Sequence, residues 1–478
     1  MFTDKIAPAV PFAGAPKINL ASAFGASPGK PLLLRIPTTG QRPIRWEAEG
    51  LPAGLELQDN VIRGTVSEAG NYPVTLRAEN ALGKSEKTVM LEIAPGNVQI
   101  APLLGFTTWN AFGSAVTQKD VEDTAARLVD MGISEYGYSY VNLDSGWQHS
   151  YGGKYDAIMP NEKFPDMKKM VDTVHSYGLK SGIYSTPMLT AWGCPAELPS
   201  IPGCTVGEPD LRFADINGGI GIVHKEKNNV LQWQEWGFDY LKYDWKPADP
   251  VNAEAMRQAL LAADRDFAYS ITIRALAEYY GYWSNYCNSF RCGPDTHREW
   301  PNLLRTFQCY RQFPECKNRG HYYDMDMLDV GTCRCDTVRG ELTEDELITE
   351  FSLRVMLRSP IQISSTLEHA EGFEQALYCN EEILAVHQDL AGWPEKLLEE
   401  EMVFAYRRTL EGGGCCCGVF NLSDSEQQVT LRFGSETQIR DLWRKQDLGK
   451  MEQLQMIVPP HCARIFACAE REIVVELG

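Results

Sequence analysis

Several short apolar segments of the chain end in acidic, basic or aromatic side chains. The residues at these ends whose types could do chemistry are Trp109, Asp144, Tyr184, Lys242, Asp244, Arg291, Asp295, Asp324 and Asp326. Aromatic rings offer flat apolar faces to a sugar, whereas carboxylates and cations hold its hydroxyls directionally. An oxocarbenium-like transition state also needs two carboxyl groups in opposed roles. This mixture predicts chemistry on a carbohydrate.

These residues need a scaffold that brings the ends of several segments together. From about residue 101, short apolar segments alternate with amphipathic helical patterns, which favours a parallel sheet with crossover helices. The predicted strands are LLGFTTW, YVNLD, KSGIYS, FDYLKYD, FAYSIT, NSFR, the region before DMDMLDV, and SPIQISS. Eight such strands predict an α/β fold, the (β/α)₈ TIM barrel, in which reactive residues come from the carboxyl ends of the strands.

Three helices of the barrel carry clear boundary signals. Residues 117–120 can form a capping box, and apolar residues follow at helical spacing up to Gly132. A second helix is expected from Pro165 to Gly178, and a third is expected to begin at Thr343 and to reach Leu357.

The barrel is expected to lie between two β-rich units. Residues 30–95 alternate polar and apolar side chains, with Gly, Pro and Asn between the runs, and 393–478 return to short alternating strands. The stretch LPAGLELQDNVIRGTVSEAGNYPVTLRAENALG resembles the immunoglobulin-like domains of bacterial surface and carbohydrate-active proteins. We therefore expect an Ig-like β-sandwich at 1–97, the catalytic barrel at 98–392 and an antiparallel β-sandwich at 393–478. For the first unit, a spacer role and a sugar-binding role both stay open.

The composition excludes some partners. The 45 basic and 64 acidic residues give a net charge of −19 and a pI near 5.0, which opposes binding to nucleic acid or to an anionic membrane. We find no basic segment followed by an apolar run at the start, and no apolar stretch of membrane-spanning length. The 14 cysteines are then expected to be reduced in a cytoplasm. A trimmed secreted or periplasmic protein and a homo-oligomer are both left open.

Cysteines with a nearby histidine are the residues of this chain that could suggest a metal site. Cys309, Cys316, Cys333 and Cys335 lie near His321 in the sequence, but their spacing is not that of paired Cys-x₂-Cys knuckles. We expect no metal and no cofactor, with a structural metal at these cysteines as the alternative.

Several ordered motifs are similar to one enzyme family. They are GFTTWN (105–110), VNLDSGWQ (141–148), GLKSGIYS (178–185), FDYLKYDW (238–245), the Arg-Cys-Gly-Pro-Asp segment 291–295 with Trp300, DMDMLDVG (324–331) and LRSPIQISS (357–365). In this order they resemble glycoside hydrolase family 27, whose members include α-galactosidases and α-N-acetylgalactosaminidases. The resemblance spans roughly 101–470. It implies a retaining exo-glycosidase that acts on a terminal α-linked galactose or a galactose-like sugar in an oligosaccharide or glycoconjugate.

The resemblance also implies roles for individual residues. Asp244 would attack the anomeric carbon, and Asp295 would protonate the leaving oxygen and then deprotonate water. The substrate-binding set would be Trp109, Asp144, Ser145, Tyr184, Lys242, Arg291, Asp324 and Asp326. The alternative for each is a structural role, such as a salt bridge for Lys242 or a turn for Asp295.

This chain also departs from the family pattern. Ser145 stands where the family has a second acidic residue after Asp144, and segments 185–194 and 271–283 lack the familiar residues. The exact sugar therefore stays open between galactose, N-acetylgalactosamine, β-L-arabinopyranose and an isomaltose-releasing specificity. A sugar-binding protein on an inactive hydrolase frame is the alternative outside enzymes.

Overall fold

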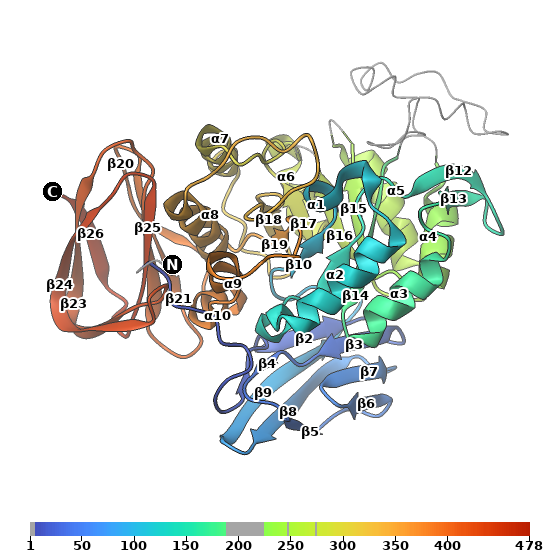
Figure 1. Cartoon of the computed structure of the whole chain (residues 1–478), viewed down its shortest axis with the longest axis horizontal. Helices are drawn as coiled ribbons and strands as arrows, with labels where there is room; N and C mark the ends of the chain where they lie inside the picture. Colours follow the sequence, from blue (N-terminus) through green and yellow to red (C-terminus); the bar gives the residue numbers. More distant parts are fainter. Residues whose placement is uncertain (1–4, 188–223, 246–247, 273–274) are drawn as a thin grey trace.

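A computed structural model describes residues 5–187, 224–245, 248–272 and 275–478. A parallel eight-stranded sheet with its helices occupies the middle of the molecule (Figure 1). An N-terminal β unit lies below it in this view, and a C-terminal antiparallel unit lies to the left.

The central sheet consists of β10 (Leu104–Thr107), β11 (Tyr140–Asn142), β14 (Lys180–Ser185), β15 (Tyr240–Asp244), β16 (Ala268–Thr272), β17 (Ser289–Arg291), β18 (Tyr322–Asp324) and β19 (Ile361–Ile363). Adjacent strands pair in parallel in the order β18-β17-β16-β15-β14-β11-β10-β19. Leu328, just beyond β18, forms a parallel bridge with Ile363 and brings the two ends of the sheet together. The predicted TIM-barrel fold class is thus confirmed.

The strands are connected mainly through helices. These are α1 (Trp109–Phe112), α2 (Gln118–Asp130), α3 (Met167–Ser176), α4 (Glu226–Trp236), α5 (Pro250–Leu261), α6 (Tyr280–Tyr286), α7 (Trp300–Tyr310), α8 (Glu344–Leu357), α9 (Phe373–Tyr378) and α10 (Glu381–Gln388). Thr117 and Asp120 form the predicted capping box, in which each side chain accepts from the other residue's backbone N–H. From this start, α2 buries Val121, Ala125 and Leu128 against the barrel. Of the described helices, none is long and apolar enough to cross a membrane.

The shorter elements lie at both ends of the barrel. They are the 3₁₀ helices at Gly113–Ala115, Ile133–Tyr136 and Ala277–Tyr279, and the hairpin of β12 (Gln148–Gly152) and β13 (Ala157–Pro160).

The N-terminal unit contains two main sheets around a separate apolar core. One sheet joins β2 (Ala23–Ala26), β9 (Gly83–Ile93), β8 (Gly70–Asn80) and β5 (Arg45–Glu49), and the other joins β3 (Pro31–Arg35), β7 (Val61–Thr65) and β6 (Leu55–Gln58). The short strands β1 (Lys17–Ile18) and β4 (Thr38–Thr39) pair with each other. Polar contacts attach this unit to the barrel, since Arg35 pairs with Glu135 at 2.6 Å and the Ser27 N–H donates to Asp266 at 2.6 Å.

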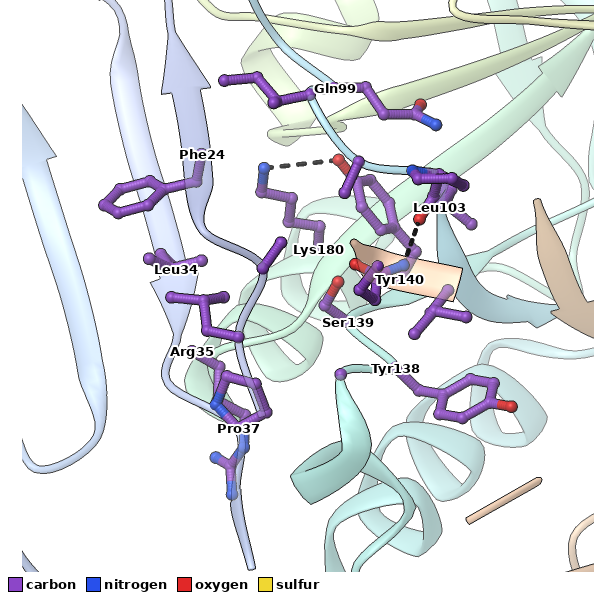
Figure 2. Close-up of a pocket in the computed structure, with 18 of the residues that line it drawn as sticks. Phe24, Leu34, Arg35, Pro37, Gln99, Leu103, Tyr138, Ser139, Tyr140 and Lys180 are labelled. Carbon is purple, nitrogen blue, oxygen red and sulfur yellow. Dashed lines mark hydrogen bonds between the residues drawn. The ribbon is translucent and has the colours of Figure 1, made fainter. Parts of the chain in front are cut away.

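A small cavity of about 120 Å³ lies between the N-terminal unit and the barrel. Figure 2 shows Leu34 and Arg35 on one side of it, and Tyr140 and Lys180 on the other. The Lys180 ammonium donates to the Tyr140 hydroxyl at 3.4 Å. Because Tyr140 and Lys180 begin their strands, the N-terminal unit covers the amino-terminal end of the barrel.

The C-terminal unit is a seven-stranded antiparallel sheet that folds over on itself (Figure 1). Its strands are β20 (Glu395–Glu400), β21 (Val403–Thr409), β22 (Cys415–Asn421), β23 (Gln427–Asp441), β24 (Gln446–Val458), β25 (Cys462–Cys468) and β26 (Ile473–Leu477). Phe404, Tyr406 and Phe420 belong to the same apolar cluster as the barrel core. The C-terminal unit is therefore joined to the barrel by continuous packing.

Candidate active site

A cavity of about 210 Å³ opens where the central strands end. Its described lining residues are Trp109, Asn110, Asp144, Tyr184, Lys242, Asp244, Arg291, Asp295, Thr296, His297, Met327 and Thr337. Asp244 and Arg291 are the last residues of β15 and β17, and Asp144 lies just after β11. The fold therefore gathers charged side chains from distant parts of the sequence at one end of the barrel.

Asp244 is a buried carboxylate with incomplete hydrogen bonding. Its side chain accepts a hydrogen bond from the Tyr184 hydroxyl at 2.9 Å through Oδ2, whereas Oδ1 has no partner among the described residues. The residue is only 5% exposed. Burial raises the pKa of Asp244, and Lys242, the Thr272 hydroxyl and Arg291 oppose that effect. Oδ1 is thus available to a reacting group.

Lys242 lies two residues before Asp244 and projects to the same end of β15. Its ammonium pairs with Asp144 Oδ2 at 2.7 Å. Burial disfavours the charged ammonium, but Asp144 and Asp244 outweigh burial and raise the pKa of Lys242. Asp144 is held in place because its own backbone N–H donates to the Thr108 hydroxyl at 2.9 Å. This fixed pair presents both a hydrogen-bond acceptor and a hydrogen-bond donor to the cavity.

Arg291 and Asp295 form the second charged pair of the cavity. Arg291 is 2% exposed, and its Nη2 donates to Asp295 Oδ1 at 2.6 Å. The Asp295 side chain is 60% exposed and faces the open cavity. Desolvation by the cavity walls acts to raise the pKa of Asp295, but the Arg291 guanidinium holds it below its usual value.

Asp326 supports this pair from behind. It accepts hydrogen bonds from the Thr296 backbone N–H at 2.8 Å and lies 3.2 Å from Arg291 Nη1. Its backbone is in the left-handed region (φ 71°), and its N–H donates to Asp324 Oδ1 at 2.8 Å. Asp326 therefore fixes both Arg291 and the segment that carries Asp295.

The sequence that forms this site matches a known protein family. The family described as Alpha galactosidase A matches residues 110–202 and 210–389 of the chain, more than half of its length. The chain belongs to this family. It is a glycosidase of the α-galactosidase type. The carboxylates that line the described cavity are Asp144, Asp244 and Asp295.

Relatives in this family cover most of the chain. Alpha-galactosidase A of Cellvibrio japonicus is 26% identical over 405 residues, covering 77% of this chain and 92% of the relative. The alpha-galactosidase of Cyamopsis tetragonoloba is 24% identical over 423 residues, covering 85% and 92%. A crystal structure of a "putative alpha-galactosidase" from Bacteroides fragilis NCTC 9343 superposes with a TM-score of 0.84 and 27% identity, covering 97% of this chain and 99% of that chain.

Within this family site, three residues expected from the sequence to contact sugar lie elsewhere. Of the described residues, Ser145, Asp324 and Asp326 do not line the cavity. The Ser145 N–H donates to Asp144 Oδ1 at 2.8 Å, and Ser145 is buried. Asp324 and Asp326 face Arg291 and the backbone instead, because the left-handed turn at Asp326 redirects the chain. Whether these three residues contact the sugar stays a prediction.

Five lining residues were not anticipated as site residues: Asn110, Thr296, His297, Met327 and Thr337. Asn110 and Met327 lie inside the quoted motifs, and Thr296 and His297 follow one of them. Their closeness to these motifs was the sequence signal that could have identified them. Thr337 lies in the long connection between β18 and α8, where no pattern identifies it. Residues 188–194 of the departing segment lie outside the described residues.

None of the described cysteines lines this cavity. Cys335 lies 3.0 Å from the Thr337 hydroxyl, and Cys316 donates to the His321 carbonyl at 3.4 Å. In the described ranges no group of three His, Cys, Asp or Glu side chains is placed to hold a metal ion, and no disulfide joins the described cysteines. The cysteines nearest the cavity make contacts with neighbouring polar groups.

Proposed function

We propose that the chain is a retaining exo-glycosidase that releases a terminal α-linked galactose from oligosaccharides or glycoconjugates. The observation that carries this proposal is that Asp244 and Asp295 face one small cavity, which the cations Lys242 and Arg291 also line. Family membership and the names of the relatives support galactose as the sugar. The cavity of about 210 Å³ suits one terminal ring, which supports exo action.

The reaction would proceed by double displacement. Asp244 attacks the anomeric carbon as the bond to the leaving oxygen breaks, and Asp295 gives that oxygen its proton. Asp295 then takes a proton from water, which attacks the same carbon and releases Asp244. Tyr184 holds one oxygen of Asp244, which leaves Oδ1 to act as the nucleophile.

Asp295 must gain a proton before it can act as an acid, yet Arg291 favours its ionised form. Arg291 already lies 3.2 Å from Asp326, so a second carboxylate is available to it. We infer that a substrate entering between Arg291 and Asp295 separates these two residues. Arg291 then stays paired with Asp326 alone. Asp295 then loses its cation and can hold the proton.

The stereochemistry of the first product tests the proposal. A retaining enzyme has its two carboxyl groups about 5–5.5 Å apart and releases the sugar with its original anomeric configuration. Proton NMR during hydrolysis of an aryl α-galactoside should show the α-anomer first, before mutarotation. Early β-anomer would contradict the mechanism. Asp244→Asn serves as the control, because it should produce neither anomer.

A second sugar specificity within the family is tested by a separate assay. The chain has Ser145 in place of a second acid, and Ser145 does not line the described cavity. A sugar without the 6-carbon would lose little at such a site. A panel of aryl α-galactoside, α-N-acetylgalactosaminide and β-L-arabinopyranoside identifies the preferred sugar by kcat/KM.

For the N-terminal unit we propose a spacer role on an Ig-like frame, within the suggested boundaries 1–97, 98–392 and 393–478. Its polar contacts to Glu135 and Asp266 of the barrel support this role. Binding of galactose by this unit in the intact chain, detected by NMR shifts of its resonances, would contradict it.

A further inference from the structure

A second cavity lies at the opposite end of the barrel from the catalytic residues. It measures about 360 Å³ and is bounded by the end of α7, the start of β18, the end of α8 and the connection into β20. Tyr322, which begins β18, lines this cavity, whereas the catalytic cavity lies beyond the other ends of the strands. The two cavities share no described lining residue.

Arg358 is the central charged residue of this second cavity. It follows α8, is only 1% exposed, and its backbone is left-handed (φ 60°), a conformation that costs energy for a residue with a side chain. Its guanidinium stacks 4.4 Å from the Trp393 ring centroid and 5.4 Å from that of Tyr322. Two aromatic rings therefore fix the plane of this cation.

The hydrogen bonding of Arg358 is incomplete on one edge. Nη1 donates to the Gly392 carbonyl at 3.2 Å. Nε and Nη2 are buried and have no hydrogen-bond partner among the described residues. These two nitrogens lie on the same edge of the guanidinium, and together they form the fork that binds both oxygens of a carboxylate.

No described carboxylate pairs with this buried cation. Asp389 is the acidic group that acts on Arg358 from nearby, but its oxygens accept from the backbone N–H groups of Ala391 and Glu411. Arg408, a second fully buried arginine, also donates to the Gly392 carbonyl. Burial and the mutual repulsion of the two cations lower the pKa of Arg408 to about 9. Two buried cations therefore lie near each other here, and Asp389 and Tyr322 act against their positive charge without forming an ion pair among the described residues.

The rest of the lining suits a ring with an acidic group. Tyr310, Phe313 and Tyr406 supply aromatic surface beside Trp393. At the rim, Lys317 pairs with Glu315 at 2.9 Å, and Glu399 receives Arg311 and Lys396. The acids of the rim are therefore occupied by the cations of the rim, and among the described residues none of these acids pairs with Arg358.

We propose that this cavity, which we call the Arg358 pocket, is a second ligand site that binds a carboxylate-bearing sugar. The Nε and Nη2 atoms hold the carboxylate, and the aromatic side chains contact the ring. The site would let the enzyme bind an acidic saccharide at a distance from the bond that it cuts. This inference does not depend on which neutral sugar the catalytic cavity accepts.

Calorimetric titration of the full chain with D-galacturonate tests the proposal. The titration is done with excess D-galactose present, which fills the catalytic cavity and matches galacturonate except for the carboxylate. Galacturonate should still bind, and Arg358→Met should weaken that binding tenfold or more. Arg358→Lys keeps the charge but lacks the fork, and it should also weaken binding. Loss of all galacturonate binding in the presence of galactose would overturn the proposal.

Arg319→Met is the matched control, because Arg319 is a nearby arginine outside the cavity that pairs with Glu92. It should bind galacturonate as the wild type does. Equal weakening in both variants would show that only the net charge of the protein affects binding, and it would contradict the site. If Arg358→Met does not fold, Trp393→Ala removes one wall from a half-buried position. Several-fold weaker binding supports the site, and unchanged affinity in Trp393→Ala overturns it.

Discussion

Two buried aspartates at opposite ends of β15 differ in how completely they are satisfied. Asp239, just before the strand, accepts from His175 Nε2 at 2.7 Å, from Arg265 Nη2 at 2.5 Å and from the Ser181 N–H at 3.0 Å. Asp244, at the other end, accepts from Tyr184 and leaves Oδ1 without a described partner. The two residues are 7% and 5% exposed, so burial alone does not separate them.

Their pKa values move in opposite directions. Burial would raise the pKa of Asp239, but Arg265 and His175 outweigh it and hold that pKa well below its ordinary value. The pKa of Asp244 is raised because burial outweighs its neighbouring cations. A buried carboxylate whose oxygens both accept hydrogen bonds stabilises the fold. A buried carboxylate with an oxygen that accepts no hydrogen bond retains the reactivity that catalysis needs.

The largest expected effect comes from Asp244→Asn. The amide cannot act as the nucleophile, so kcat/KM for an aryl α-galactoside should fall about 10³-fold or more. The melting temperature should stay the same or rise, because the substitution removes an incompletely satisfied buried charge. Thermal unfolding and steady-state assays check both parts. A large loss of stability would mean that Asp244 is a structural residue like Asp239.

Asp239→Asn is the matched substitution at the other end of the strand. It leaves Arg265 and His175 without their carboxylate, and removing one partner of a buried pair costs about 3–5 kcal/mol. Chemical denaturation should show this loss in the free energy of unfolding. The folded fraction should keep kcat within about twofold. A variant with normal stability but no activity would reverse the roles that we assign to the two residues.

A third prediction concerns the pH profile. Arg291 favours the ionised form of Asp295, so Arg291→Gln should raise the pKa of Asp295. Asp295 would then keep its proton to higher pH, and the alkaline limb of kcat/KM should move upward even as the rate falls. Because substrate is expected to separate the pair, the alkaline limb of wild-type kcat should lie above that of kcat/KM. If the alkaline limbs of kcat and kcat/KM coincide, the idea that substrate separates Asp295 from Arg291 is wrong.

The smallest effect is expected at Ser145. This residue is buried and is not among the described residues that line the cavity, so Ser145→Ala should change the ratio of kcat/KM values for α-galactoside and β-L-arabinopyranoside by less than about threefold. A tenfold change would show that Ser145 reads the sugar after all. Parallel assays of wild type and variant with the two aryl glycosides measure the ratio.

Much of this architecture could be predicted from the sequence. Alternating apolar segments and capping signals identified the barrel strands and the helix at residues 118–130, because these features depend on local spacing. The position of Asp244 at a strand end also followed from that spacing. The orientation of Asp326 did not, since its left-handed backbone turns the side chain toward Arg291. The Arg358 pocket was equally hidden, because it depends on segments that are distant in the sequence.

The junction between β18 and β19 has a consequence for motion. In the described part of the chain, these two strands are joined only around Leu328, whose N–H donates to the Gln362 carbonyl at 2.8 Å and whose carbonyl accepts from the Ser364 N–H at 2.9 Å. Other neighbouring strands share longer ladders, so amide protons near Leu328 should exchange with solvent sooner than those of β15. Asp326 lies two residues away. Transient opening of this junction would therefore loosen the support of Arg291 while the remaining ladders stay closed.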